Sequence, residues 1–350
     1  MRLISLIFSL IFIVSCKKDE PVDPPVSENL SNGMVVLCEG LFQHNNSTVS
    51  WVDFSTGTIA NNLFSTKTGR QLGDTGNDMQ RYGGKIYIIV NVSSTVEVMN
   101  ATSFSSIKQI SMIQSGIAKQ PRSMAFHNGK VYVTCYDGFV DVIDTTSLTV
   151  TQRIPVGSNP EGLSVSNNKL YVANSGGLNF PVPDSTVSVI DLTSHVEVER
   201  ITVGMNPGGV ITDAQGDIYV IARGDYGAEP SRMVRIDTQL DEVAETFVFD
   251  ASGMYPMNDK FLVTYFNHTT QASTIGLFNP LTESMEVPNY ISTSGITTLY
   301  GIAYRQSSNT LFLLDAMNYT NSGYVREYSL TGSLIQSFHV GLNPTKIIFL

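Results

Sequence analysis

The sequence is short of cysteine, tryptophan and charged residues, and the scarcity of cysteine and of basic residues excludes two classes of protein. Its 350 residues include three Cys, one Trp and only 15% charged residues, while 42% are hydrophobic. The hydrophobic fraction excludes general disorder, and three cysteines cannot form a disulfide framework. Basic residues are also scarce, 21 against 31 acids, so the formal net charge is −10. Because such a chain repels phosphate backbones, we expect no nucleic-acid partner.

Motifs for catalysis and metal binding are missing as well. The five histidines are scattered without an HExxH or HxH pair: His44, His127, His195, His268 and His339. A metal site needs clustered ligands, so we expect no metal. GxSxG, P-loop and DxDxDG patterns are also absent. We therefore expect neither an enzyme nor a bound cofactor.

The first sixteen residues have the pattern of a lipoprotein signal. Arg2 precedes a mostly apolar run over residues 3–14, which is shorter than the roughly twenty residues of a bilayer span and is typical of a signal-peptide core. The run ends in Ile-Val-Ser-Cys at residues 13–16, which resembles the bacterial lipobox, whose cysteine is acylated. We expect a signal peptide over 1–15 and lipidation of Cys16. The alternative is an ordinary cleaved signal that happens to contain a cysteine.

Residues 16–32 join this anchor to the rest of the chain. The tetrad Lys-Lys-Asp-Glu at residues 17–20 resembles the export signal that sends lipoproteins of Bacteroidetes-type bacteria to the outer face of the outer membrane. Residues 21–32 are rich in Pro, Ser, Glu and Asp, which predicts a flexible tether. We expect a protein at the cell surface that is held to the outer membrane by its lipid anchor alone.

One short phrase recurs seven times and predicts the fold. Its copies are NGMVVL at 32, GGKIYI at 83, NGKVYV at 128, NNKLYV at 167, QGDIYV at 215, NDKFLV at 258 and SNTLFL at 308. Their mean spacing of about 46 residues is typical of four-stranded propeller blades. Cys38 and Cys135 fall on non-adjacent blades, so we expect no disulfide.

Each copy contains four strand-like parts separated by turns. In the fourth copy they span residues 161–166, 169–174, 185–191 and 198–204, with Gly, Asn, Asp and Pro between them. The chain starts on a second-type strand at Met34 and ends on a first-type strand over 344–350. We predict an all-β, seven-bladed β-propeller of four-stranded antiparallel blades over residues 33–350. The C-terminal strand should pair with the N-terminal blade and close the ring.

Loop lengths predict a binding face. The links from second to third strands and from each fourth strand to the next blade emerge on one side, the long-loop face; the other links form the short-loop face. The second-to-third links are long over 39–48, 174–184, 223–230, 266–272 and 316–323, whereas the first-to-second turns are short. Insertions on one face of a repeat protein mark its binding face.

Aromatic, amide and basic residues gather in these loops. The candidate ligand-binding residues are Phe42, Gln43, Asn45, Asn46, Tyr136, Asn174, Phe180, Arg223, Tyr226, Phe266, Asn318 and Tyr319. Exposed aromatic rings beside amides suit a large, flat ligand with neutral polar groups, or a protein patch. The alternative is that the rings only pack against the blades.

Two resemblances sharpen these expectations. The fourth copy, with YVANSGG, STVSVID, ITVG and NPGG, resembles the YVTN/YncE-like propeller repeats, and the likeness extends over 32–350. The stretches CEGLFQHNNSTVSWVD, GRQLGDTGNDM and YIIVNVSSTVEVM are similar to a family of Bacteroidetes surface lipoprotein propellers. Some of its members capture cobalamin (vitamin B12) and pass it to a TonB-dependent transporter.

The second resemblance implies capture of a corrinoid for a TonB-dependent outer-membrane transporter. Two alternatives remain open, because a propeller fold hosts many activities. One is a platform for protein–protein interaction or adhesion. The other is an enzyme similar to lactonase or lyase propellers.

Overall fold

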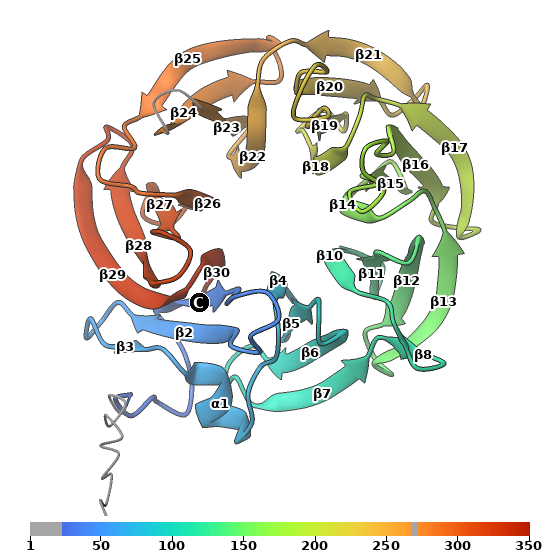
Figure 1. The fold of residues 1–350 in the computed structure, drawn as a ribbon. Coiled ribbons are helices and arrows are strands. Elements are labelled where there is room, and N and C mark those ends of the chain that lie inside the picture. The colour runs from blue at the N-terminus through green and yellow to red at the C-terminus, as the bar shows by residue number, and fades with distance from the viewer. Residues whose placement is uncertain (1–22, 268–271) are drawn as a thin grey trace, which may run out of the picture.

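The computed structural model describes residues 23–267 and 272–350, so the predicted signal peptide, Cys16 and the export signal lie outside the described residues. Within these ranges, seven four-stranded antiparallel sheets stand like blades around a central channel (Figure 1). The predicted all-β, seven-bladed propeller is confirmed.

The four strands of each blade follow one another from the channel to the rim. Blades 1 and 2 are β30 (Pro344–Phe349), β1 (Gly33–Cys38), β2 (Thr48–Asp53) and β3 (Ile59–Ala60), then β4 (Gly76–Tyr82), β5 (Lys85–Val90), β6 (Thr95–Asn100) and β7 (Ser106–Ser111). Blades 3 and 4 are β10 (Pro121–His127), β11 (Lys130–Cys135), β12 (Phe139–Asp144) and β13 (Thr149–Pro155), then β14 (Pro160–Ser166), β15 (Lys169–Asn174), β16 (Thr186–Asp191) and β17 (Val196–Thr202). Blades 5 and 6 are β18 (Pro207–Thr212), β19 (Ile218–Ala222), β20 (Arg232–Asp237) and β21 (Glu242–Phe247), then β22 (Ala251–Met257), β23 (Lys260–Asn267), β24 (Ala272–Asn279) and β25 (Ser284–Ile291). Blade 7 is β26 (Leu299–Arg305), β27 (Thr310–Asp315), β28 (Ser322–Ser329) and β29 (Leu334–Leu342).

The two ends of the described chain meet in blade 1. β30 pairs antiparallel with β1, for example Ile347 with Val36, and the sheet order is β3-β2-β1-β30. In Figure 1 the red C-terminal strand therefore lies beside the blue N-terminal ones. All six residues of β1 are buried, and without β30 their ladder groups would be exposed at the channel. The predicted closure is confirmed.

The second strand of each blade forms the middle of the core. These strands are buried on both faces because each sheet packs between two others. Tyr132, Tyr171 and Tyr219 are fully buried there. Their hydroxyls reach the turn between the third and fourth strands of the next blade; the Tyr171 hydroxyl donates to Asp241 Oδ1 at 2.6 Å. In these three blades the tyrosine thus connects one blade to the next.

The recurrent aspartate at the end of the third strand shapes the following turn. The Asp144 carboxylate accepts hydrogen bonds from the backbone N–H groups of Thr146 and Ser147 at 3.0 and 2.8 Å. These backbone bonds, that of Ser147 foremost, together with Lys130, lower the pKa of Asp144 to about 2. Asp191 caps the equivalent turn of blade 4 through the backbone of Thr193 and Ser194. Short-range capping therefore explains the repeated Val-Ile-Asp pattern.

Residues 23–32 of the predicted tether contact the propeller. Leu30 is buried, and its N–H donates to the Thr102 carbonyl at 2.7 Å. Val26 packs against the core shared by blades 1 and 2, and Lys67 Nζ donates to the Ser27 carbonyl at 2.9 Å. The prediction of a flexible tether is therefore corrected for residues 23–32, because two apolar side chains in this polar segment find a place on the blades.

Two short elements were not predicted. α1 (Leu63–Thr68), the only α-helix of the described ranges, lies outside blades 1 and 2 (Figure 1) and buries Leu63 and Phe64. β8 (Ile113–Gln114) and β9 (Ile117–Ala118) form a small hairpin between blades 2 and 3, with both isoleucines exposed.

Cys38 and Cys135 are buried free thiols. Burial raises the pKa of the Cys38 thiol to about 11. The position of this thiol in the core therefore accounts both for its weak acidity and for the absence of a disulfide. Among the described residues, no helix has the length and apolar character needed to cross a membrane.

Candidate functional site

Every innermost strand carries a one-residue β-bulge near its start, at the long-loop end of the channel. In β4, Gly76 pairs with Val90 and Asp78 with Ile89, so Asn77 has no ladder partner. A bulge leaves a residue unpaired and redirects its side chain. We call the bulge residues, together with Glu39, Arg223 and Lys346, the channel mouth. The bulge residues are Asn77, Arg122, Ser123, Glu161, Gly162, Gly208, Ser252, Tyr300 and Thr345.

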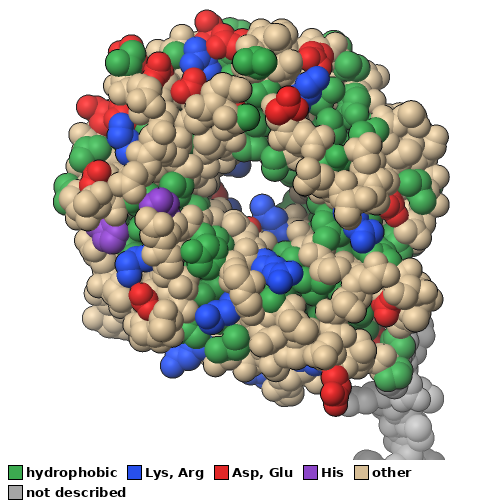
Figure 2. Space-filling view, turned by 180° about the vertical axis from the view of Figure 1, so that it is seen from behind, with side chains coloured by type: hydrophobic (Ala, Val, Ile, Leu, Met, Phe, Trp, Pro, Cys, Tyr) green, Lys and Arg blue, Asp and Glu red, His purple; other side chains and the backbone are tan. Residues whose placement is uncertain are grey.

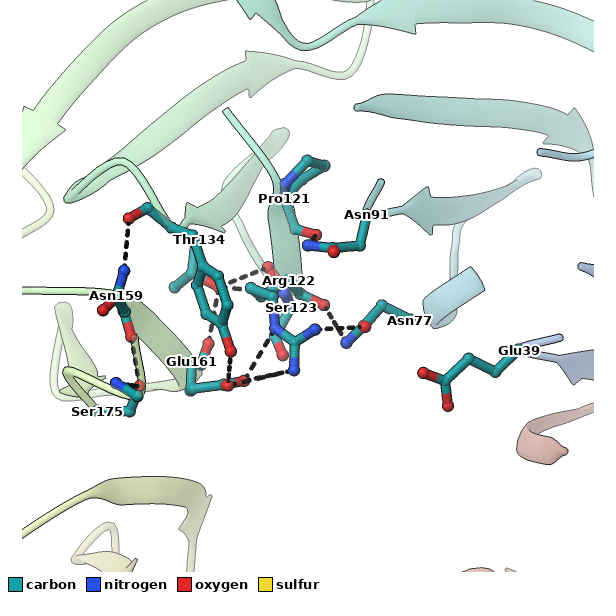
Figure 3. A network of polar contacts seen from close by, with 12 residues as sticks. Glu39, Asn77, Asn91, Pro121, Arg122, Ser123, Thr134, Asn159, Glu161 and Ser175 are labelled. Atoms are coloured by element: carbon teal, nitrogen blue, oxygen red, sulfur yellow. Dashed lines mark hydrogen bonds and ion pairs between the residues drawn. The ribbon is translucent and has the colours of Figure 1, made fainter. Parts of the chain in front are cut away.

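Arg122 is the centre of a polar network at this mouth (Figure 3). Its Nε and Nη2 donate to the two carboxylate oxygens of Glu161 at 3.1 and 3.2 Å, and its Nη1 donates to Asn77 Oδ1 at 2.7 Å. The guanidinium lies over the Tyr136 ring, 4.7 Å from its centroid, and the Tyr136 hydroxyl donates to Glu161. The bulges of three successive blades are therefore joined through one arginine fork.

A second carboxylate faces this network. Figure 3 shows Glu39 on the other side of Asn77 from Arg122, with no direct bond to the network. Glu39 accepts a hydrogen bond from the Tyr300 hydroxyl of blade 7. Its own backbone is fixed, since its carbonyl accepts from Ser47 Oγ and from the Gly76 N–H.

Burial controls the protonation of these groups. It raises the pKa of Glu39, against the opposing effects of the Tyr300 hydrogen bond and of Arg122. Burial and the adjacent carboxylates also raise the pKa of Tyr136, beside Glu161, and of Tyr300, beside Glu39. Both phenols therefore stay protonated and act as donors. The mouth offers a ligand a fixed set of hydrogen-bonding groups around an opening.

The opening leads into a cavity of about 350 Å³ lined by innermost strands of several blades. Arg223 enters it from the loop after β19, over Gly208: a side-chain carbon at residue 208 would lie 2.5 Å from the Arg223 Cζ. Lys346 enters from β30, with its Nζ 3.7 Å from Asp78 Oδ1. The cavity is strongly polar, and its volume lies within the range of small-molecule sites.

Three residues predicted from the sequence adjoin the channel mouth. Tyr136 contacts Arg122 and Glu161 as described, and Arg223 lines the cavity. Tyr319 packs edge-on against Tyr300, with ring centroids 5.8 Å apart.

Four predicted aromatic side chains are exposed. The exposed fractions are 65% for Phe42, 75% for Phe180, 78% for Tyr226 and 48% for Tyr319. Phe180 and Tyr226, from neighbouring blades, line one small pocket of about 40 Å³. The Tyr226 hydroxyl accepts from Asn206 Nδ2 at 3.1 Å. These rings do not pack into the blade cores, so they are accessible to a ligand.

Most of the predicted amide residues have structural contacts. Asn174 is fully buried; its Oδ1 accepts from the Gly157 N–H, and its Nδ2 donates to Thr186 and Ser188. It is therefore inaccessible to a ligand in this structure.

Other predicted amide residues hold their own loops. Asn46 Oδ1 accepts from the Leu41 N–H at 2.8 Å, and Asn318 Oδ1 accepts from residues 320 and 321. Gln43 and Asn45 donate their backbone N–H groups to the Asp74 carboxylate, and their side chains are exposed.

Phe266 lies on strand β23, paired with Ser273, and not in a loop as expected. It borders a separate apolar pocket of about 670 Å³ with Phe249, Tyr265 and Met285. The predicted residues are thus not one cluster: some surround the channel mouth, two meet in the small pocket, and Phe266 belongs elsewhere.

Sequence reasoning missed the central network of Arg122, Glu161, Asn77, Glu39 and Tyr300. A signal was nevertheless present. In four blades the innermost strand begins with a proline, namely Pro121, Pro160, Pro207 or Pro344. The residue type directly after this proline differs from blade to blade within an otherwise regular repeat. Within the described residues, no group of three His, Cys, Asp or Glu side chains could hold a metal ion.

A known family matches most of the chain. Residues 32–272, more than half of the sequence, match the family described as a domain of unknown function (DUF5074). The chain belongs to this family. A comparison with curated proteins gives no match.

Similar solved structures support the propeller fold of this DUF5074 member. A quinoprotein alcohol dehydrogenase-like protein from Bacteroides thetaiotaomicron has 15% sequence identity and a TM-score of 0.67, covering 92% of this chain and 79% of that one. A functionally unknown protein from Desulfotomaculum acetoxidans has 12% identity and a TM-score of 0.60, covering 91% and 98%. The hydrazine synthase of Kuenenia stuttgartiensis has 16% identity and a TM-score of 0.54, covering 75% and 85%. At these identities the likeness concerns the fold alone, which is a scaffold compatible with binding a ligand or a protein.

Proposed function

We propose that the protein captures a broad ligand over the channel mouth on its long-loop face, and that this ligand is a corrinoid. One observation carries the proposal: exposed aromatic rings on loops of four different blades accompany a mouth lined by fixed polar groups. Large exposed aromatic side chains are costly to leave in water and commonly mark binding surfaces.

The distribution of the rings favours a broad ligand. Phe180 and Tyr226 share a pocket of only about 40 Å³, and the mouth cavity holds about 350 Å³. Phe42 and Tyr319 lie on the loops of blades 1 and 7. A ligand that contacts all of these rings must extend across several blades.

The chemistry of the mouth suits a corrin ring. Such a ring is broad, partly apolar and fringed with amide side chains. Aromatic faces can pack on its apolar parts. The phenol oxygens of Tyr136 and Tyr300, whose protons are donated to Glu161 and Glu39, can still accept hydrogen bonds from its amide N–H groups.

The setting of this capture is part of the proposal. The lipobox-like sequence at Cys16 and the following tetrad favour a lipoprotein on the outer face of the outer membrane. There the long-loop face would collect a corrinoid and pass it to a TonB-dependent transporter. Binding, not catalysis, is the proposed activity.

Isothermal titration of the purified protein with cyanocobalamin tests the proposal. We expect saturable binding, and we expect the double variant Phe180→Ala/Tyr226→Ala to weaken it by about thirtyfold or more, since each of the two lost packing contacts costs about 1–3 kcal/mol. The matched control is Leu240→Ala/Leu281→Ala, which removes two side chains that are 65% and 71% exposed on the short-loop face. Its affinity should equal that of the parent.

Absence of heat from a folded sample at micromolar concentration would remove the corrinoid and favour the protein-interaction alternative. Equal losses in both double variants would place the ligand away from the long-loop face.

A further inference from the structure

Two cations at the channel mouth, Arg223 and Lys346, are held less closely by acidic side chains than Arg122 is. Within residues 23–267 and 272–350, no hydrogen bond or ion pair engages the Arg223 guanidinium, which lines the mouth cavity. Lys346 is about half exposed and lies 3.7 Å from Asp78, beyond hydrogen-bond length. The Asp78 carboxylate already accepts from Gln80 Nε2 and from the Met124 N–H. Lys346 therefore forms only a long ion pair with Asp78 and leaves its ammonium accessible to a further partner.

The third cation of the mouth is in a different state. The Arg122 fork is occupied by both oxygens of Glu161 and by Asn77. The remaining acid, Glu39, accepts from Tyr300, and burial raises its pKa. The cations of this cavity that remain available to a ligand are thus Arg223 and, beside its long ion pair with Asp78, Lys346.

The backbone makes room for Arg223. A Cβ at residue 208 would lie 2.5 Å from its Cζ and 2.5 Å from its Nη2, so only glycine in the bulge of β18 lets the guanidinium occupy this place. Lys346 comes from β30, the strand that closes the ring. Two elements far apart in the sequence therefore bring cations into one cavity.

The location of these cations contrasts with the rest of the molecule. The chain carries a formal charge of −10. Figure 2 shows the ring from the side opposite to Figure 1, which is the short-loop side; Lys or Arg side chains are visible inside the open centre, and most acidic side chains lie toward the outer rim. The mouth cavity is lined by three cations, Arg122, Arg223 and Lys346, and by two acids, Asp78 and Glu161. A local excess of positive charge concentrates anions.

From this geometry we propose that the mouth cavity binds an anionic oxygen group of the ligand, a phosphate or a carboxylate, between Arg223 and Lys346. A guanidinium fork pairs with two oxygens of such a group, and an ammonium adds a point charge. The inference rests on the proposed function in that it names the group recognised at the same site, but the anion can be probed alone.

The first test uses inorganic phosphate and acetate as probes. Thermal unfolding of the purified protein is followed in sodium phosphate, sodium acetate and sodium chloride at equal ionic strength. An anion that binds only the folded state raises the unfolding temperature, so we expect phosphate, acetate or both to raise it above the value in chloride. The anion with the larger shift distinguishes a phosphate site from a carboxylate site.

The variant Arg223→Gln/Lys346→Gln should abolish this shift, and Arg223→Lys should retain part of it. The matched control is Arg81→Gln/Lys108→Gln, which removes the same charges from exposed positions at the far end of β4 and on the outer strand β7. The control should keep the full shift. Equal shifts in the parent and in Arg223→Gln/Lys346→Gln, or no shift in the parent, would overturn the inference.

The second test separates this inference from the corrinoid proposal. Cyanocobalamin carries a phosphodiester, and dicyanocobinamide lacks it. Arg223→Gln/Lys346→Gln should lower the affinity for cyanocobalamin by about tenfold or more and leave the affinity for dicyanocobinamide unchanged. Equal weakening of both would overturn the anion site and leave corrinoid binding in place. If neither corrinoid binds while the phosphate shift depends on Arg223 and Lys346, the corrinoid proposal fails and the anion site stands.

Discussion

The second strands and the bulges of the innermost strands lie side by side in every blade, yet their sequences behave in opposite ways. At the centre of the second strands the seven blades carry similar buried residues: Val36, Tyr87, Tyr132, Tyr171, Tyr219, Leu262 and Phe312. At the bulge the seven blades carry seven different residue types: Asn77, Arg122, Glu161, Gly208, Ser252, Tyr300 and Thr345.

The difference follows from what surrounds each position. A second-strand side chain is enclosed by the neighbouring sheets, so packing limits it to large apolar or tyrosine side chains. A bulge residue has no ladder partner, and most of the bulge residues line the mouth cavity, so packing limits their identity less, although the Arg223 guanidinium leaves room only for glycine at residue 208. The repeated positions therefore specify the fold, and the variable positions are available for a ligand.

Deleting residues 344–350 should have the largest effect, because β30 carries a bulge residue and also covers a second strand, β1. The deletion removes the bulge of blade 1 and also exposes the fully buried strand β1. We expect loss of cooperative thermal unfolding, or aggregation, measured by circular dichroism and size-exclusion chromatography. A synthetic peptide of residues 344–350 should restore part of the stability. A truncated protein with the melting curve of the parent would show that ring closure does not need this strand.

A pair of single substitutions sharpens the comparison. Tyr171→Ala should lower the free energy of unfolding by about 3–5 kcal/mol, since it removes a fully buried ring. Thr345→Ala, at a bulge of the mouth cavity, should change it by less than about 0.5 kcal/mol. Urea unfolding measures both. If Thr345→Ala were as costly as Tyr171→Ala, the bulge positions would belong to the core and the comparison would fail.

The repeated half of the molecule could be predicted from the sequence. The pattern predicts the second strand of blade 4 over residues 169–174, and the strand has these bounds; it predicts the fourth strand over 198–204, and that strand lies at Val196–Thr202. Repetition supports these strand assignments, because the same pattern of strands and turns recurs in every blade. Closure followed from the out-of-phase ends for the same reason.

The channel mouth could not be predicted in this way. An extra residue in a strand breaks the alternation of faces, so the direction of Arg122 or Glu161 cannot be counted along the sequence. Their contact also joins two blades, 39 residues apart. Conversely, asparagines such as Asn46 and Asn318 were assigned to the ligand although their side chains stabilise turns, a common use of asparagine in loops.

α1 and the docked segment 23–32 escaped prediction for a simpler reason. A six-residue helix is too short for a helical periodicity to show. In the docked segment, Val26 and Leu30 are the apolar residues that bind it to the blades, and so few do not alter its polar composition.

The smallest expected effect is the pH dependence of Glu39 at the mouth. Burial raises the pKa of this carboxyl above its ordinary value of 4.5. Between the ordinary and the raised value the folded protein binds more protons than the unfolded chain, so the free energy of unfolding falls as pH rises through this window. Glu39→Gln removes the titration and keeps an acceptor for Tyr300. Urea unfolding from about pH 3 to about pH 7 should therefore show a flatter decline above pH 4.5 in the variant than in the parent.

Asp144, in a turn of the repeat, supplies a control of opposite sign. The pKa of its carboxyl is lowered from 3.8 to about 2 by the backbone of Ser147, by Lys130 and by the backbone of Thr146. It therefore contributes stability that is present above pH 3.8 and lost as pH falls toward 2. Asp144→Asn should remove only this acid-side dependence and leave the slope above pH 4.5 unchanged. An equal slope above pH 4.5 in Glu39→Gln and the parent would contradict the raised pKa. The predicted opposition has a physical meaning: the repeated turn aspartate stabilises the fold when ionised, whereas the mouth carboxylate lowers stability when ionised, as expected of a charge held in a partly buried site for binding.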